Sequence, residues 1–245
     1  MTPRVWTALG ALVAVVGVVL AIVGLDLGEH GADGSIAAVS FGSPQAINEE
    51  YYATYPSPHT PGSGTATAVD ITLKNTGDSP LRIVRIEAKV LDETMINCSR
   101  QGGGSVVSAF YSIVIPYHFG KLTSDSTSAP VNFTVKPDSV DRMVITVGPK
   151  ETINGHAIVL GLQLRLIPES GDPIEVEPFA VSQPESVSRA IKLVTSGFLQ
   201  RGDTDNYLGQ CATEQVSALD RIFQVTKVQA DDVKALRTTY AGVAT

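Results

Sequence analysis

The stretch that decides the fold is residues 69–90, VDITLKNTGDSPLRIVRIEAKV. Apolar Val69, Ile71 and Leu73 alternate with polar residues, and a second alternation runs from residue 84 to residue 90. Because successive side chains of a strand point to opposite faces, this period of two indicates two strands, each with one solvent-exposed face. Residues 75–80 combine Asn, Gly and Pro, which favour a chain reversal between the two strands.

Further runs of the same kind follow along the chain. They cover residues 111–115, 131–135, 143–147, 158–166 and 174–176, and turn residues separate them. Seven or more short strands without a convincing helix between them indicate an antiparallel sandwich, in which two sheets share one core. This series excludes a parallel α/β architecture, because such folds place a helix between successive strands.

The N-terminal segment has a different character, because residues 5–25 are 21 consecutive positions without a charge. A helix of that length is about 31 Å long and matches the apolar thickness of a bilayer. A signal peptide is the alternative, but its apolar core usually spans only about 7 to 15 residues, and no convincing cleavage site follows here. We therefore expect an uncleaved transmembrane helix.

The charges on either side of this segment predict its orientation. Arg4 precedes it, whereas Asp26, Glu29 and Asp33 follow it with no Lys or Arg before Lys74. The positive-inside tendency then predicts a single-pass protein of the cell (plasma) membrane, with a cytoplasmic N-terminus and the C-terminus outside.

Small residues recur at helical spacing within the predicted span, and their common face would let a second helix approach closely. The alternative is that Gly and Ala are simply common in membrane helices. If the face is a contact, the partners are the lipid bilayer and a second copy of the chain or another membrane protein. The face consists of Thr7, Gly10, Ala14, Gly17, Ala21 and Gly24.

The predicted fold class is mainly β, with an N-terminal transmembrane helix, an antiparallel immunoglobulin-like β-sandwich and a short α-helical C-terminal tail. The predicted divisions are a cytoplasmic stub (1–4), the transmembrane helix (5–25), a linker with one early strand (26–65), the sandwich (66–182) and the helical tail (183–245). In the tail, Ser182 and Glu185 have capping-box spacing ahead of a first helix, although a strand is nearly as plausible there. Two more helices are predicted over residues 207–223 and 231–240, with Gly242 just past the end of the last.

The hairpin-like stretch from residue 69 to residue 90, with its Asn-Thr-Gly-Asp-x-Pro-Leu turn, resembles bacterial immunoglobulin-like envelope modules. The layout of anchor, sandwich and Cys-bearing helical tail resembles uncharacterised single-pass envelope proteins of high-GC Gram-positive bacteria. The resemblance implies an exported immunoglobulin-like sandwich and a place in the cell envelope. It implies no activity.

The chain has two cysteines, Cys98 and Cys211. Outside the cytoplasm an even number of thiols tends to oxidise, so we expect a disulfide that pins the tail to the sandwich. Two separate buried thiols are the alternative. Neither a redox catalyst nor a zinc site is indicated, because there is no Cys-x-x-Cys and no nearby His.

The remaining residues give no catalytic or cofactor motif. The formal charge of −7 argues against nucleic acid as a partner. The four histidines, His30, His59, His118 and His156, are scattered without ligand spacing. Asp138 and Asp141 have the form of a calcium pair but also suit a Pro-Asp turn without an ion. We therefore predict no cofactor and no metal.

Two functions remain open at this level. The first is a non-catalytic interaction or scaffold module of the cell envelope with an unknown envelope partner. The second is a surface receptor or enzyme that acts on envelope polysaccharide or a small ligand, with Tyr51, Tyr52 and Tyr55 as stacking residues. The tyrosines could equally cover the sandwich edge.

Overall fold

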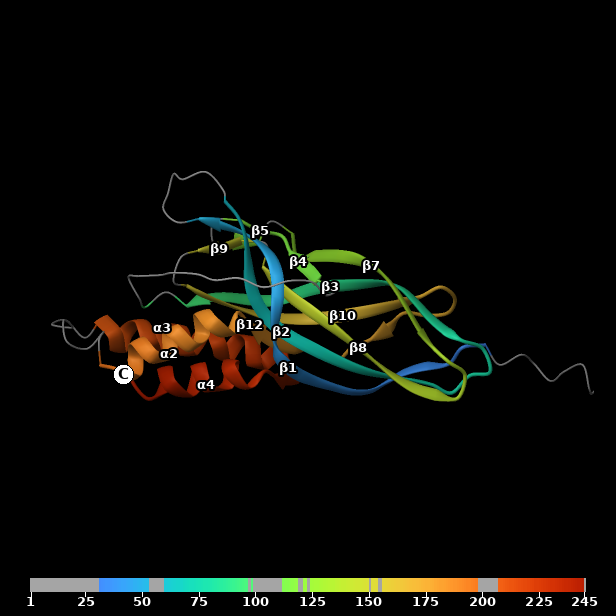
Figure 1. The fold of residues 1–245 in the computed structure, drawn as a ribbon. Helices are drawn as coiled ribbons and strands as arrows, with labels where there is room; N and C mark the ends of the chain where they lie inside the picture. The colour runs from blue at the N-terminus through green and yellow to red at the C-terminus, as the bar shows by residue number, and fades with distance from the viewer. Residues whose placement is uncertain are drawn as a thin grey trace, which may run out of the picture.

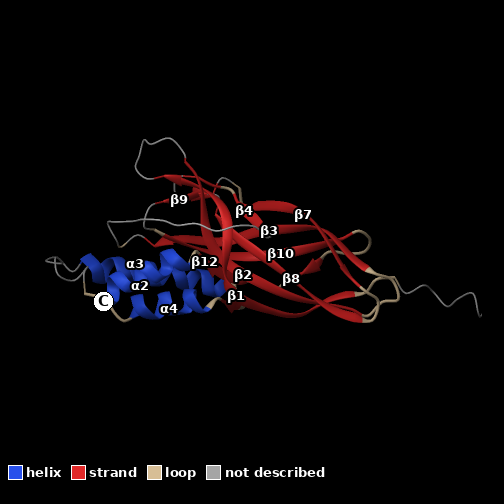
Figure 2. Ribbon diagram, in the orientation of Figure 1, coloured by secondary structure: helices blue, strands red, loops and turns tan. Residues whose placement is uncertain are grey.

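The computed structural model describes residues 31–52, 60–96, 98, 112–118, 121–122, 124–149, 151–153, 156–197 and 207–244. This part of the chain is mainly β. Its strands form an elongated body, and its helices lie together at one end of that body (Figures 1 and 2).

Two large sheets carry the fold. The first sheet has the strand order β4 (Ser112–Ile115), β8 (Ser139–Pro149), β2 (Thr60–Asn75), β1 (Gly34–Tyr52), β9 (Glu151–Ile153). The second sheet has the order β13 (Val228–Gln229), β12 (Phe179–Ser182), β10 (Ala157–Pro168), β3 (Leu81–Ile96), β7 (Ser126–Val135), with β11 (Ile174–Glu175) also paired to β10. A small separate sheet pairs β5 (Tyr117–His118) with β6 (Lys121–Leu122).

The long strands pair antiparallel, but three short strands pair parallel. These parallel pairs are β4 with β8, β9 with β1, and β13 with β12. All three lie at the outer ends of the two strand orders, so the purely antiparallel sandwich expected from the sequence holds for the central strands and not for these edges.

The inward faces of the two sheets share one hydrophobic core. The alternation in the sequence accounts for it, since every second residue of β2, β8 and β10 points inward. The core includes Val69, Ile71 and Leu73 from β2, Met143, Ile145 and Val147 from β8, and Leu160, Leu162, Leu164 and Leu166 from β10.

The chain reversal after residue 74 carries the chain from the first sheet to the second. Asn75, the last residue of β2, is fully buried. Its side-chain amide donates to the carbonyl oxygens of Ser79 at 2.8 Å, Lys136 at 3.2 Å and Val135 at 3.3 Å. Its Oδ1 accepts from the backbone N–H groups of Gly77 at 3.1 Å and Asp33 at 3.2 Å. The buried amide therefore joins three loops at this end of the sandwich.

The first half of β10 is buried on both of its faces. Ile158 and Leu160 point into the core of the sandwich, whereas Ala157 and Val159 belong to a second core on the outer side of the sheet. Three helices cover that outer side: α2 (Pro184–Thr195), α3 (Tyr207–Val225) and α4 (Asp231–Ala241). Gly161 lets α3 approach, because a Cβ at this position would lie 3.3 Å from Ile222 of α3 and 3.3 Å from Thr226, the residue that follows α3.

The structure corrects the fold class and the location predicted from the N-terminal segment. No helix within the described ranges is both long enough and apolar enough to cross a bilayer. The long helix α3 carries the charged residues Glu214, Asp220 and Arg221, and α2 and α4 are only 12 and 11 residues long. The helix predicted over residues 5–25 and its face of small residues lie outside the described residues. The transmembrane and single-pass membrane assignments are not retained.

The linker predicted over residues 26–65 also differs from the structure. β1 and β2 pair along almost their whole length, from Gly34 opposite Asn75 to Tyr51 opposite Thr60. The Pro- and Gly-rich start of β2 adopts strand geometry because β1 gives it a continuous partner. Pro44 fits in β1 because it lies at a register shift between Gly42 and Gln45, where a ladder hydrogen bond is not required.

The helical tail agrees with the sequence in its elements but not in its first cap. The last helix ends at Ala241 with Gly242 as its C-cap, as predicted. The first helix begins at Pro184 with Gln183 as its N-cap, and the predicted capping box is wrong. Ser182 instead lies in β12, and its hydroxyl donates to the carboxylate of Asp232 in α4.

Candidate functional site

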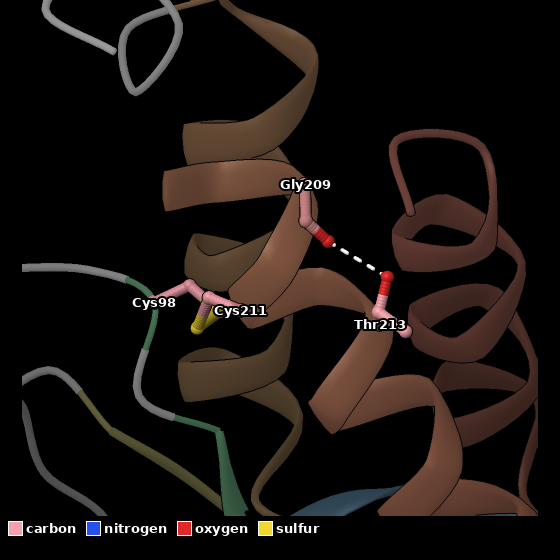
Figure 3. The surroundings of a disulfide bond; sticks show 4 residues. All are labelled: Cys98, Gly209, Cys211 and Thr213. Atoms are coloured by element: carbon pink, nitrogen blue, oxygen red, sulfur yellow. Dashed lines mark hydrogen bonds between the residues drawn. A yellow bond between two sulfur atoms is a disulfide. The ribbon is translucent and has the colours of Figure 1, made fainter. Parts of the chain in front are cut away.

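The junction between the sandwich and the helical tail contains the disulfide. Cys98 follows β3, and Cys211 lies in the first turns of α3 (Figure 3). Their sulfurs are bonded at 2.02 Å, and their Cα atoms lie 6.0 Å apart. Both residues are buried, at 4% and 8% exposure. The structure thus brings together the two cysteines that the sequence analysis paired, and the bond ties α3 to the chain just beyond the end of β3.

The second core surrounds this disulfide and holds the three helices to the sheet. Val187 and Val194 of α2, Leu219 and Ile222 of α3, and Tyr240 of α4 are all buried in it. Burial raises the pKa of the Tyr240 phenol to about 12, because the charged form would lose its hydration. The tail is therefore a packed part of the fold rather than an appendage.

A groove of about 560 Å³ opens beside this junction. One wall is α2 and the other is the bulge of β1 at Pro44, and the groove is lined by Pro44, Pro184, Glu185, Ser188, Arg189 and Lys192. The four polar residues stand at intervals of three, one and three along α2, so they share the helix face opposite Val187, Ala190 and Val194, which are buried. The sequence thus builds one polar face directly over the groove.

The two basic side chains that line the groove, Arg189 and Lys192, have no ion-pair partner in the described structure. Within the described part of the chain, the side chains of Arg189 and Lys192 also make no hydrogen bond. Several arginines of the described chain are paired instead: Arg165 contacts Glu87 and Glu175, and Arg237 contacts Asp220. Cationic side chains without an ion-pair partner can bind an anionic group of a ligand.

The outer face of the first sheet gives a useful contrast. Arg142 on β8 donates to both carboxylate oxygens of Asp70 on β2, and Asp70 is largely buried. The hydrogen bond and the charge of Asp70 raise the pKa of Arg142. This guanidinium already has its partner, so the face offers no free charge at that position.

The histidines and acidic residues considered from the sequence do not converge. His118 lies in β5, and His156 stands just before β10, where burial lowers its pKa. Asp138 adopts a positive φ of 46° in the exposed turn between β7 and β8, and Asp141 accepts from the N–H of Arg142. Over the residues described, no group of three or more His, Cys, Asp or Glu side chains could hold a metal ion.

Several sequence candidates cannot be placed in this way. His30, His59 and Tyr55 lie outside the described residues, as does the small-residue face from Thr7 to Gly24. Tyr51 and Tyr52 lie at the end of β1, and Tyr51 is opposite Thr60.

The groove was not predicted from the sequence. Its two walls are about 140 positions apart in the chain, since Pro44 comes from β1 and the remaining residues from α2. The helical spacing of residues 185, 188, 189 and 192 was present in the sequence. However, a polar helix face that only meets water has the same spacing, so this pattern does not indicate a groove. Only the fold shows which side of α2 meets β1.

Comparisons with known proteins add no identity. No family model matches the chain, and no curated protein matches it. Among solved structures, a structural genomics target is 10% identical, with 61% of this chain and 84% of that chain covered and a TM-score of 0.27. A protein described as ApaA from Bordetella pertussis is 11% identical over 63% of this chain and 97% of its own, also with a TM-score of 0.27. The sporulation control protein Spo0M from Bacillus subtilis is 15% identical over 64% of this chain and 56% of its own, with a TM-score of 0.22. Likenesses this weak support no conclusion about fold or role.

Proposed function

We propose that the protein is a non-catalytic interaction module of an oxidising compartment such as the cell envelope, and that it binds its partner in the groove between α2 and the β1 bulge. The observation that carries this proposal is the groove itself, with two unpaired cations on a helix that is packed firmly onto the sheet. Binding surfaces that are already ordered lose little conformational entropy when a partner arrives.

The disulfide supports both parts of the proposal. Disulfides persist in oxidising compartments and are rare where glutathione keeps thiols reduced. The bond between Cys98 and Cys211 also limits motion of α3 relative to the sheet, and α2 and α4 pack in the same core. The groove wall is therefore held in place by covalent and apolar contacts.

The alternative of an enzyme acting on polysaccharide receives no support from this groove. Glycoside hydrolysis generally uses a pair of carboxylates on either side of the bond that is cleaved. Glu185 is the one carboxylate among the residues that line the groove. A binding function needs no such pair.

Site-specific photo-crosslinking in the cells that produce the protein tests the proposal. A photoreactive amino acid replaces the exposed Ser188 in the groove, and a matched variant carries it at the exposed Ser128 on β7. We expect one reproducible adduct from position 188, none of that mass from position 128, and loss of the adduct when Arg189 and Lys192 are changed to Glu. Equal labelling from both positions, or no adduct from position 188, would contradict the proposal.

A further inference from the structure

The charges along the groove indicate what kind of segment it takes, if the proposed binding function holds. We propose that the groove binds an extended peptide segment of a partner protein, with acidic side chains over Arg189 and Lys192 and a basic side chain beside Glu185. The ligand is thus a segment of mixed charge in a fixed order rather than any anion.

The charges along α2 change sign from one end of the groove to the other. Glu185 stands at one end of the groove, the neutral Ser188 follows, and Arg189 and Lys192 occupy the other end. At a rise of about 1.5 Å per residue, Arg189 lies about 6 Å along the helix from Glu185, and Lys192 about 4.5 Å further. Two residues of an extended chain span about 6.6 Å, so alternate residues of a bound strand match these intervals within the reach of the side chains.

The unpaired cations supply the attraction. A guanidinium binds a carboxylate through two parallel hydrogen bonds, and an ammonium group adds a flexible point charge. Because neither Arg189 nor Lys192 has an ion-pair partner in the described structure, an incoming carboxylate displaces no internal contact. The formal net charge of the whole chain is −7, whereas Arg189 and Lys192 place two positive charges side by side in the groove.

Glu185 supplies the selectivity. Its carboxylate is exposed at the same groove, and it repels a ligand that is negative along its whole length. A polyphosphate or a uniformly acidic peptide would place an anion against it. A basic residue of the ligand at that end turns the repulsion into an ion pair.

The two prolines shape the groove for an extended backbone. Pro44 stands at the bulge of β1 and Pro184 at the first turn of α2, so their rings form apolar walls on both sides. Apolar walls of this kind pack against the aliphatic stems of Lys, Glu and Asp side chains while the charged ends reach the polar face.

Fluorescence anisotropy with the full chain tests this inference. The probe is the fluorescein-labelled peptide Gly-Lys-Ala-Glu-Ala-Glu-Gly, and the composition control is Gly-Glu-Ala-Lys-Ala-Glu-Gly. We expect saturable binding of the probe, with the composition control and Gly-Glu-Ala-Glu-Ala-Glu-Gly binding about tenfold more weakly, which is about 1.4 kcal/mol. Inorganic pyrophosphate at the same concentration should not displace the probe.

Charge-reversed variants locate the binding. R189E/K192E should lose the probe, and the matched variant K74E/K136E, which changes two exposed lysines elsewhere, should retain it. The triple variant E185K/R189E/K192E should prefer Gly-Glu-Ala-Lys-Ala-Lys-Gly instead. This gain of binding cannot come from misfolding.

The outcomes separate the two proposals. No preference between the probe and its composition control, displacement by pyrophosphate, or no response to R189E/K192E would overturn the peptide inference. If the photoreactive residue at position 188 still crosslinks to one partner in cells, the groove remains a binding surface and only the proposed class of ligand is wrong. If both experiments fail, the proposed function falls as well.

Discussion

The Cα atoms of Cys98 and Cys211 lie 6.0 Å apart although 113 positions separate them in the sequence. The bond closes a loop that contains most strands of the second sheet and the whole of α2. It therefore joins the end of β3 to the helix that covers the outer face of the same sheet.

Replacing both cysteines by Ala should lower the free energy of unfolding by about 4 to 5 kcal/mol, because the unfolded chain regains the freedom of a long loop. Urea titration followed by circular dichroism measures this change. The wild-type protein treated with a reductant is the control and should shift by a similar amount. A loss below about 1 kcal/mol would show that the second core alone fixes the tail.

Asn75→Ala should destabilise the protein by about 2 to 3 kcal/mol, since it leaves buried N–H and C=O groups at the end of the sandwich without their partner. The partners at stake are the backbone groups of Asp33, Gly77 and Ser79. Chemical denaturation gives the magnitude. Thr72→Ala, a nearby half-buried position on the outer face of β2, serves as the comparison and should cost far less. Equal losses for the two variants would remove the special role of this amide.

Gly161→Val should separate α3 from β10. A Cβ at residue 161 already meets Ile222 and Thr226 at 3.3 Å, and the two further methyl groups of Val have no room. We expect a loss of about 1 to 3 kcal/mol and faster hydrogen exchange in α3. Gly42→Ala is the matched control, because its Cβ would make only an ordinary 3.6 Å contact with Ala68. Unchanged exchange in α3 would argue against close packing at this crossing.

Tyr240 should make the protein sensitive to alkaline pH. Its pKa is raised from the ordinary 10.0 to about 12 by burial, so the folded state favours the neutral phenol. This contribution to stability is fully present below pH 10.0 and is lost as the pH rises through about 12. Urea midpoints of the wild type and Tyr240→Phe, compared between pH 8 and pH 11, isolate it from other groups. The variant should lose less stability than the wild type over this interval, and parallel losses would be the contrary result.

The sequence was most informative where one face of a strand meets water. The alternation at residues 69–73 and 143–147 predicted strands that the structure places in β2 and β8 with the expected residues inside. Hydrophobic periodicity also located α3, because this helix buries one stripe against the sheet. The end of α4 was predicted from Gly242, which lies just past it. These features follow from local patterns.

Other features depended on contacts between distant segments. The Pro- and Gly-rich residues 60–64 form strand because β1 pairs with them. The hydroxyl of Ser182 donates a hydrogen bond to Asp232 in α4 and does not cap the helix that follows it. The chain reversal at residues 75–80 was predicted, but its transfer between two sheets was not. The groove between Pro44 and α2 depends on packing of this kind, which no local pattern contains.

The number of cysteines has a consequence for how the protein matures. With two thiols the chain has a single internal connectivity, whereas four would already allow three, so no isomerase is needed to sort right pairings from wrong ones within one molecule. Cys98 is synthesised long before Cys211 and meets no competing thiol in the chain meanwhile. Oxidative errors can therefore arise only between separate molecules, and their frequency should rise with the concentration of newly made chains.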